Sequence, residues 1–234
     1  MHLSTIGSTT RTLGRLGLGA VPLLLMLCAL SSTALAAASG SEGETWFTEG
    51  LQYERIARPV PTHVAPGKVE VVEMFWYGCP HCYHFEPYLK KWLSEKPEAA
   101  EFRRIPAALN PGWQILAKTY YALELMGEAE RLHPIIFQAI HEQGRRLRDL
   151  DSIGRFLAQQ GVDEQRFRQA FGSLPVQTRV QEAVYLGRDY GLNGVPTVVV
   201  NGKYRTSASL AGGYDEVLDV VNFLVDKESH GTRP

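Results

Sequence analysis

The sequence contains very little cysteine, with only 3 in 234 residues: Cys28, Cys79 and Cys82. No second C-x-x-C pair accompanies Cys79 and Cys82, which excludes the zinc sites that are built from two such pairs. A disulfide across so short a loop would remove little entropy from the unfolded chain, so a structural staple is a poor explanation for the pair. The pair therefore indicates a chemical role.

The chain also lacks an excess of charge of either sign, with 24 Lys and Arg residues against 25 Asp and Glu residues. A formal net charge of −1 gives no indication of nucleic acid or an anionic membrane as a partner. Internal repeats and low-complexity tracts are absent. With 44% hydrophobic and 21% charged residues, the composition is that of a globular protein, long enough for one elaborated domain or two small ones.

Long apolar runs are missing except near the N-terminus, where two arginines precede LGLGAVPLLLMLCAL and the small residues SSTALAAASG follow. A basic start, a short apolar core and an A-x-A exit predict a secretory signal peptide over residues 1–38, cleaved near 36–38. A permanent membrane anchor is the alternative, but the run is short for a bilayer span and Pro22 interrupts it. Cleavage removes Cys28, so only the pair would reach an oxidising compartment, where disulfides persist.

The first part of the mature chain combines strand and helix signals. KVEVVEMFWY, residues 68–77, is apolar and β-branched and predicts a buried strand. CPHCYHFEPYLKKWLSEK follows with apolar residues at helical spacing, and Pro80 suits a first helical turn. EFRRIP, residues 101–106, predicts a second short strand. The cysteine pair therefore lies where a strand ends and a helix begins.

The rest of the chain is first helical and then returns to strands. Helical periodicity continues from about 110 to 190, where Pro134 is expected to open one helix and Asp151 to cap another. TVVV and KYRT then flank Asn201 and Gly202, the strongest short-range signal for a β-hairpin, and a last amphipathic helix follows.

This order of elements predicts an α/β protein. Residues 39–106 and 191–234 would together form a small sheet with helices on its faces, and residues 107–190 would form an inserted all-helical domain.

Several kinds of site use a C-x-x-C spacing. Haem attachment needs a histidine directly after the second cysteine, and that position is Tyr83. Zinc needs further ligands, and nothing in the spacing of His63 and His84 requires them to take part, so a metal-binding module stays open as the non-enzymatic alternative. Redox exchange explains more, because it needs one accessible sulfur and a second sulfur near enough to resolve the mixed disulfide.

The position at a helix start favours a thiolate on the first cysteine, because unpaired backbone N–H groups and the helix dipole stabilise negative charge there. His81 lies between the two sulfurs and adds a positive charge or a hydrogen bond. We therefore expect Cys79 to be the exchanging thiol, with a lowered pKa, and Cys82 to be the buried resolving thiol. A couple whose reduced form is stabilised is an oxidant. No metal or separate cofactor is expected, since the redox-active group is the Cys79–Cys82 disulfide.

Over about residues 50–228 the chain resembles the DsbA family of bacterial periplasmic thiol:disulfide interchange proteins. The resemblance lies in CPHC after an E-x-F-x-Y strand, the inserted helical block and the later GVPTVVVNGKY. The resemblance implies a thioredoxin-like fold with an inserted all-helical domain. It implies a periplasmic monomer that donates disulfides to reduced, unfolded secreted proteins and is reoxidised by a DsbB-like, quinone-linked membrane oxidase. A disulfide isomerase or reductase on the same scaffold is the alternative. Isomerases generally carry a dimerising N-terminal domain, however, and reductases more often have Gly-Pro between the cysteines.

The resemblance also assigns roles outside the cysteine pair. Val195-Pro196 matches the family's cis-proline loop, although base rates alone favour a trans bond, and the Val195 backbone would bind an extended client peptide. Glu73 matches the family's buried acid and is expected to transfer protons, while an ion pair with Arg103 or Arg104 is the structural alternative. The catalytic set implied by the resemblance is Cys79, Pro80, His81, Cys82 and Pro196.

Aromatic residues surround the motif where better-known members have more phenylalanine. Tyr77, next to the site, is expected to contact substrate at the surface, whereas Trp76 is expected to pack the helical insertion. Trp113 is expected in the core at the domain junction. His133 and His141 are expected on helix surfaces.

Overall fold

The structure is a computed structural model that describes residues 47–231, and these residues belong to one compact unit. The predicted signal peptide over residues 1–38 lies outside the described residues. Within residues 47–231, no helix is long and apolar enough to cross a membrane.

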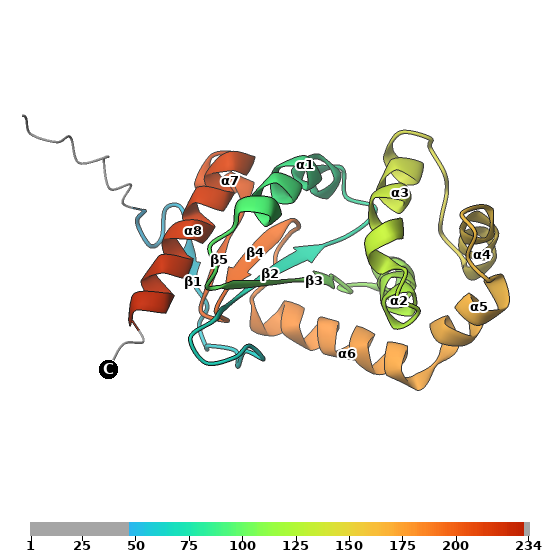
Figure 1. The fold of residues 1–234 in the computed structure, drawn as a ribbon, viewed down its shortest axis with the longest axis horizontal. Coiled ribbons are helices and arrows are strands. Elements are labelled where there is room, and N and C mark those ends of the chain that lie inside the picture. The colour runs from blue at the N-terminus through green and yellow to red at the C-terminus, as the bar shows by residue number, and fades with distance from the viewer. Residues whose placement is uncertain (1–46, 232–234) are drawn as a thin grey trace, which may run out of the picture. The chain divides into compact units, whose positions relative to one another are not determined.

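A mixed sheet forms the centre of the described chain, with the strand order β1-β5-β4-β2-β3 (Figure 1). Its strands are β1 (Glu54–Arg55), β2 (Val69–Phe75), β3 (Ala100–Pro106), β4 (Thr197–Val200) and β5 (Tyr204–Thr206). β2 pairs in parallel with β3 and antiparallel with β4, so the strand that leads to the cysteines has neighbours on both edges. All seven residues of β2 are buried, as its apolar sequence predicted.

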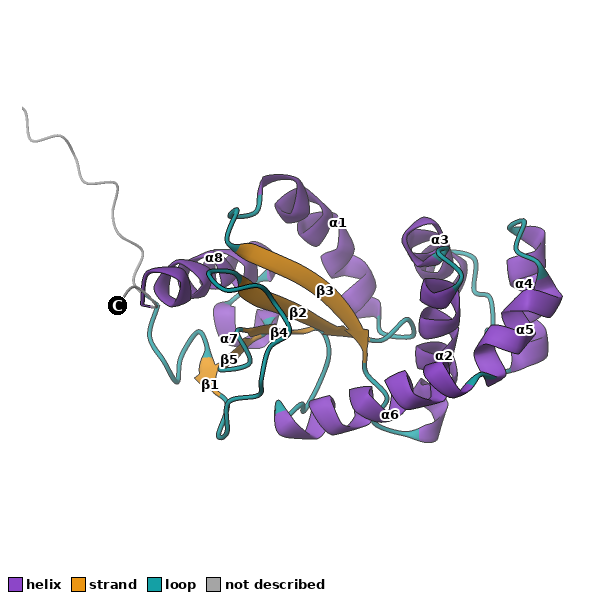
Figure 2. Ribbon diagram, turned by 60° about the horizontal axis from the view of Figure 1, so that its bottom comes forward, coloured by secondary structure: helices purple, strands orange, loops and turns teal. Residues whose placement is uncertain are grey.

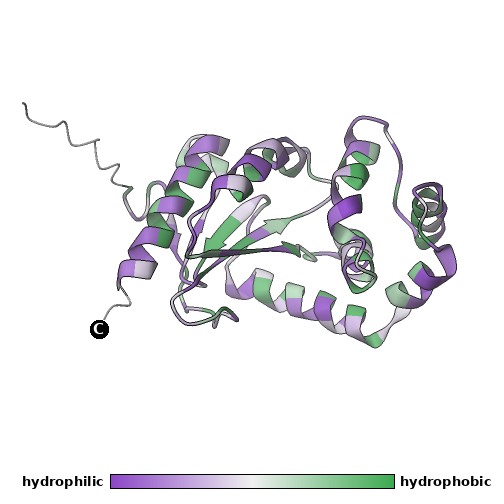
Figure 3. Ribbon diagram, in the orientation of Figure 1, coloured by the Kyte–Doolittle hydropathy of each residue, from purple (hydrophilic) through white to green (hydrophobic). Residues whose placement is uncertain are grey.

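Helices cover both faces of the sheet (Figures 1 and 2). One face carries α1 (Pro80–Glu95) and α8 (Tyr214–Gly231), and the other carries α6 (Leu174–Asp189). Side chains of β2 point alternately to the two faces of the sheet and pack against the helices on each face. Val69 and Val71 pack with α1 and α8, whereas Val72 and Met74 belong to the cluster on the other face. In Figure 3 β2 and β4 are mostly hydrophobic, and the helices carry both hydrophilic and hydrophobic residues.

The helical block predicted after the second strand is present between β3 and β4. It comprises α2 (Pro111–Leu125), α3 (Ala129–His141), α4 (Leu150–Gln159), α5 (Glu164–Gly172) and α6. The α/β architecture with inserted helices is therefore confirmed. The boundaries 107–190 stay a prediction, because strand residues such as Phe75 and Ile105 share one hydrophobic cluster with Leu123 and Phe137 of the insertion.

Two local expectations in the helical block are wrong. Pro134 lies inside α3, which begins five residues earlier at Ala129. Asp149, not Asp151, caps α4, because its extended backbone lets its side chain accept the N–H of Ser152 at 2.7 Å in a capping box.

The hairpin expectation is correct. Asn201 and Gly202 connect β4 and β5 with φ angles of 51° and 61°, the left-handed backbone that a tight hairpin turn requires. The two-residue β1 and the four-residue α7 (Ala208–Ala211) were not predicted from the sequence.

Candidate active site

The two cysteines lie at the junction between β2 and α1, as the sequence predicted. Cys79 is the N-cap of α1 and has an extended backbone, and Pro80 is the first residue of the helix. The backbone N–H of Cys79 donates to the oxygen of Trp76 at 2.9 Å, which fixes the turn between strand and helix. Both cysteines are free thiols in this structure.

The surroundings of the two thiols separate their acidities. The pKa of Cys79 is lowered to about 6, chiefly because its thiolate accepts a hydrogen bond from the Cys82 thiol. The backbone N–H groups of Cys82 and His81 and the imidazole charge of His81 stabilise the thiolate further. Burial of Cys79 opposes this shift. Burial, together with the hydrogen bond to Cys79, raises the pKa of Cys82. Cys79 is 8% exposed and Cys82 is 0% exposed. The pair thus combines a slightly exposed sulfur that favours the thiolate with a fully buried thiol.

The loop before β4 lies against Cys79. The Val195-Pro196 peptide bond is cis, and the Cys79 thiol donates to the Val195 oxygen at 3.3 Å. A cavity of about 250 Å³ beside this loop is lined in part by His81, Val195, Pro196 and Tyr214. His81 Nδ1 and the Tyr214 hydroxyl share a hydrogen bond of 3.3 Å. No sequence signal singled out Tyr214, which reaches the site from the start of α8.

Glu73 is fully buried on β2, and its position in the alternation places it on the face covered by α1. Arg104 on the neighbouring strand donates to Glu73 Oε2 at 3.1 Å and to Glu86 Oε2 at 3.3 Å. Burial first, and the charge of Glu86 second, raise the pKa of Glu73, and Arg104 opposes the shift only in part. The other carboxyl oxygen of Glu73, Oε1, has no hydrogen-bond partner among the described residues.

Two aromatic residues near the site differ from expectation. Tyr77 is 1% exposed, so the expected surface contact with substrate is wrong. Its hydroxyl lies 3.0 Å from His133 Nδ1, and His133 Nε2 lies 3.1 Å from Glu86 Oε1. His133 is 4% exposed, packs edge-on against Phe75, and is therefore a core residue and not a helix-surface one. Burial lowers its pKa, and the neutral ring satisfies both neighbours by donating to the carboxylate and accepting from the tyrosine.

Comparison with known proteins assigns the family. The model of the DSBA-like thioredoxin domain family matches residues 106–219. The thiol:disulfide interchange protein DsbA of Azotobacter vinelandii is 40% identical over 208 residues, which cover 88% of this chain and 97% of the relative. The DsbA of Pseudomonas aeruginosa is 40% identical over 182 residues, covering 78% and 86%. The chain belongs to the DsbA family.

Solved structures of the DsbA family support the assignment. The crystal structure of Pseudomonas aeruginosa DsbA superposes with a TM-score of 0.76 at 38% identity, over 80% of this chain and 97% of that one. The oxidoreductase DsbA from Xylella fastidiosa gives a TM-score of 0.74 at 33% identity, over 79% and 98%. The chain is thus a thiol:disulfide oxidoreductase with the thioredoxin-like fold and helical insertion of the DsbA family.

Other aromatic residues join the two parts of this DsbA fold. Trp76 stacks on Trp113 of α2, with ring centroids 4.6 Å apart and an interplanar angle of 7°, which confirms the packing expected of Trp76. Trp113 is half-buried, so the expectation of a core position is only partly correct. His141 donates to the Tyr77 backbone oxygen at 2.8 Å and stacks on Tyr83.

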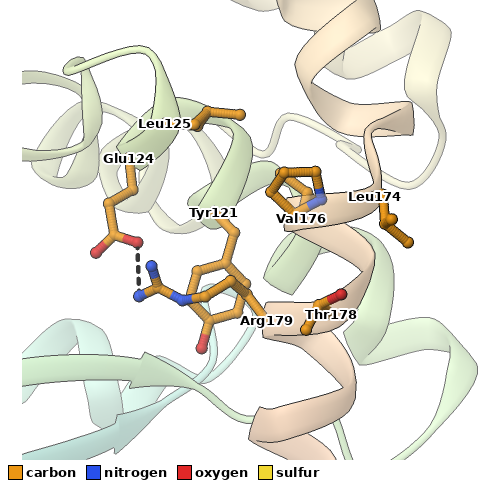
Figure 4. A pocket seen from close by; sticks show the side chains of 8 residues that line it. Tyr121, Glu124, Leu125, Leu174, Val176, Thr178 and Arg179 are labelled. Carbon is orange, nitrogen blue, oxygen red and sulfur yellow. Dashed lines mark ion pairs between the residues drawn. The ribbon is translucent and has the colours of Figure 1, made fainter.

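A further pocket, of about 640 Å³, lies between α2 and α6 (Figure 4). Glu124 and Arg179 form an ion pair of 2.9 Å across it, and the Arg179 guanidinium lies over the Tyr121 ring. None of the residues that line this pocket was predicted as a site residue. Within residues 47–231, no three His, Cys, Asp or Glu side chains are grouped so that they could hold a metal ion.

Proposed function

We propose that this DsbA-family enzyme donates disulfides to reduced, unfolded secreted proteins in the periplasm. The observation that carries the proposal is the opposite shift of the two pKa values, lowered at Cys79 and raised at Cys82. A thiolate that is stabilised in the reduced enzyme is a good leaving group, and it makes the disulfide form ready to accept electrons.

The exchange proceeds in two displacements. A client thiolate attacks Cys79 Sγ of the oxidised enzyme, so that a client–Cys79 bond forms and the Cys79–Cys82 bond breaks, with the electron pair leaving on Cys82. A second client thiolate then attacks the client sulfur of this mixed disulfide, and Cys79 leaves as a thiolate. The client loses two electrons and two protons; one proton is taken up by Cys82 and the other passes to solvent.

In this proposal Glu73 donates the proton to Cys82 and is reprotonated by a proton that the client releases. A sulfur with a raised pKa leaves poorly unless it is protonated as the bond breaks. The raised pKa of Glu73 favours its protonated form, and its Oε1 has no described hydrogen-bond partner that would compete for that proton. The hydrogen bond from Arg104 to the other carboxyl oxygen holds the carboxyl group in place.

Clients bind as an added strand against Val195 and Pro196. The Val195 oxygen accepts a hydrogen bond from the protonated Cys79 thiol, and this donor is absent from the thiolate and from the disulfide. The freed oxygen then accepts a backbone N–H of the client, an interaction that requires no particular client sequence. Such binding suits an enzyme that serves many unfolded proteins.

The remaining parts of the proposal concern the cell. The predicted signal peptide over residues 1–38 supports export to the periplasm. A quinone-linked membrane oxidase of the DsbB kind reoxidises Cys79 and Cys82, and the enzyme works as a monomer without metal or separate cofactor.

The test mixes the oxidised enzyme with an equal amount of a fully reduced secreted protein. Loss of client thiols matched by gain of enzyme thiols supports donation. Rearrangement of a scrambled client without net thiol loss would favour an isomerase, and net reduction of an oxidised client would favour a reductase. Stoichiometric metal in the purified protein would favour a metal-binding module.

A further inference from the structure

A cleft of about 670 Å³ opens beside the cysteine pair and takes no part in the exchange described above. One wall contains Trp76 and Gly78, and Gly78 directly precedes Cys79. The start of α2, with Trp113, forms another wall. The loop 142–149 between α3 and α4 closes the cleft. A polypeptide bound to Cys79 therefore has this cleft within one residue of its attachment point.

The apolar wall of the cleft is rigid. A Cβ at position 78 would lie 2.4 Å from the Trp76 ring, so the indole rests directly on the bare glycine backbone. The same Trp76 indole also stacks on the ring of Trp113. The indole N–H of Trp76 is buried and has no hydrogen-bond partner in the described chain. The wall is thus a fixed aromatic surface.

The part of the cleft that the loop 142–149 contributes is basic. Arg145, Arg146 and Arg148 all line the cleft and are exposed. Leu147, 6% exposed, anchors the loop between them, and the N–H of Arg145 donates to the oxygen of Ala139 at 2.9 Å. The loop is therefore held in place while its three arginines stay exposed.

These guanidinium groups have no carboxylate partner within residues 47–231. Other arginines of the chain do form ion pairs, among them Arg104 with Glu73 and Glu86. The two acids at the ends of the loop have partners of their own: Glu142 accepts from Tyr83 and Gln138, and Asp149 accepts the Ser152 N–H. A chain with a formal net charge of −1 thus concentrates unpaired positive charge at the rim of its active site.

We propose that this cleft binds an acidic segment of the client polypeptide, next to the client cysteine that reacts with Cys79. The inference rests on the proposed disulfide donation and adds a preference among clients. Arginine recognises carboxylates through paired N–H donors, and a basic rim beside a reactive group raises the association rate of an acidic partner. A polypeptide is the occupant because the client chain is already attached one residue from the cleft wall.

The test uses two sets of three two-cysteine peptides, with a triplet before one cysteine in the first set and after it in the second. Within a set the peptides differ only in that triplet, which is Asp-Glu-Asp, Asn-Gln-Asn or Lys-Lys-Lys. The rate of oxidation by the oxidised enzyme is measured at low and high salt. The cleft variant replaces Arg145, Arg146 and Arg148 with glutamine. The matched control replaces the exposed Arg58, Arg166 and Arg188, which do not line the cleft, and changes the net charge equally.

We expect the wild-type enzyme to oxidise the acidic peptide about tenfold faster than the neutral one at low salt, with the difference shrinking at high salt. The control variant should keep this ratio, and the cleft variant should reduce it to about one. Glutamate at the three cleft positions should reverse the preference toward the lysine peptide, which guards against a variant that simply folds poorly.

Equal rates for the acidic and neutral peptides in the wild-type enzyme would overturn the inference, and so would loss of the ratio in the control variant. Binding of the enzyme to anionic lipid vesicles through the same arginines, without any peptide preference, would identify a membrane site and overturn it as well. Failure of the proposed function is separate, because then the wild-type enzyme would oxidise none of the peptides.

Discussion

The thiol of Cys79 donates a hydrogen bond to the backbone oxygen of Val195, with 3.3 Å between Sγ and O. This bond joins the start of α1 to the loop before β4, 116 residues further along the chain. It needs the thiol proton, so it is lost when Cys79 ionises or enters a disulfide. Because the pKa of Cys79 is lowered to about 6, the reduced enzyme occupies this edge itself only at acidic pH, and the edge is open to clients when Cys79 is in a disulfide.

Replacing Cys82 with serine should trap the enzyme on its clients. Cys79 remains able to attack a client disulfide, but serine cannot displace the client from the mixed disulfide. Non-reducing electrophoresis of the variant mixed with an oxidised client should reveal a covalent complex that the wild-type enzyme does not accumulate. The matched Cys79→Ser variant should form none, because Cys82 is fully buried and its pKa is raised. Equal trapping by both variants would contradict the assigned roles.

The stability of the reduced enzyme relative to the oxidised enzyme should depend on pH. In the folded reduced form the pKa of Cys79 is lowered from 9.0 to about 6. A lowered folded-state pKa stabilises the fold fully above the unfolded value, and this stabilisation is lost as the pH falls through the folded value. The oxidised form has no such titration. Urea unfolding of both forms between about pH 9 and about pH 5 should show that the free energy of unfolding of the reduced form, relative to the oxidised form, decreases as the pH falls.

Constant separation of the two unfolding midpoints over that range would contradict the lowered pKa of Cys79. In the folded enzyme the raised pKa keeps Cys82 a thiol, so Cys82 affects the measurement only near pH 9, where the unfolded chain releases its proton. A direct titration of thiolate absorbance in the reduced enzyme gives an independent value for Cys79.

Replacing His81 with serine should weaken the oxidant only moderately. The Cys82 thiol makes the largest contribution to the lowered pKa of Cys79, and the backbone N–H of residue 81 survives the substitution. We expect the pKa of Cys79 to rise by less than about one unit, and the equilibrium with glutathione to shift toward the oxidised enzyme by less than about tenfold. His84→Ser, an exposed change on the same helix, is the control and should leave both measurements unchanged.

The sequence predicted those features that depend on neighbours along the chain. The apolar run of β2, the proline at the start of α1 and the Asn201–Gly202 turn are all local signals, and each produced the expected element. The position of Cys79 at a helix N-terminus followed from them. The same local reasoning failed between Asp149 and Asp151, because both are good caps and only the actual backbone angles decide which one acts.

Features that depend on residues distant in the chain could not be predicted. Tyr77 and His133 each carry polar atoms and so were assigned to surfaces, but across 56 residues of chain they satisfy one another inside the core. Glu86 and Arg104 join this buried network in the same way. The basic cleft likewise exists only because the loop after α3 folds back on Trp76 and Gly78.

Replacing Glu73 with glutamine should slow client oxidation without shifting the Cys79 titration. Glutamine keeps the shape of the carboxyl group but cannot donate its proton to Cys82, and loss of a general acid costs about a hundredfold in rate. Rapid mixing of the oxidised variant with a dithiol peptide measures the effect. Glu70→Gln is the matched control, since Glu70 is also buried on β2 but pairs with Arg103 and packs on the other face.

The Glu73 variant also makes a prediction about stability. Burial raises the folded-state pKa of Glu73 above 4.5, so the folded wild-type protein retains a proton that the unfolded chain releases. The stability that the Glu73 carboxyl contributes is therefore complete below pH 4.5 and is lost as the pH rises toward the raised folded-state pKa. Glutamine at this position should remove this pH dependence. If the variant showed the wild-type rate and the wild-type pH dependence of unfolding, Glu73 would have no part in proton transfer.

Replacing Gly78 with alanine should damage both the fold and the exchange reaction. The added Cβ would lie 2.4 Å from the Trp76 ring, which the stack on Trp113 prevents from moving freely. Such overpacking costs about 1–3 kcal/mol in the free energy of unfolding, and tryptophan fluorescence should report the displaced indole. Gly172→Ala, where nothing lies within 4 Å, is the control and should change stability by less than about 0.5 kcal/mol.

Because the Cys79 N–H donates to the Trp76 oxygen, a displaced Trp76 also shifts the turn that presents Cys79, so client oxidation should slow in the Gly78→Ala variant. Unchanged fluorescence, stability and rate would mean that Trp76 does not hold the active-site turn against the helical insertion.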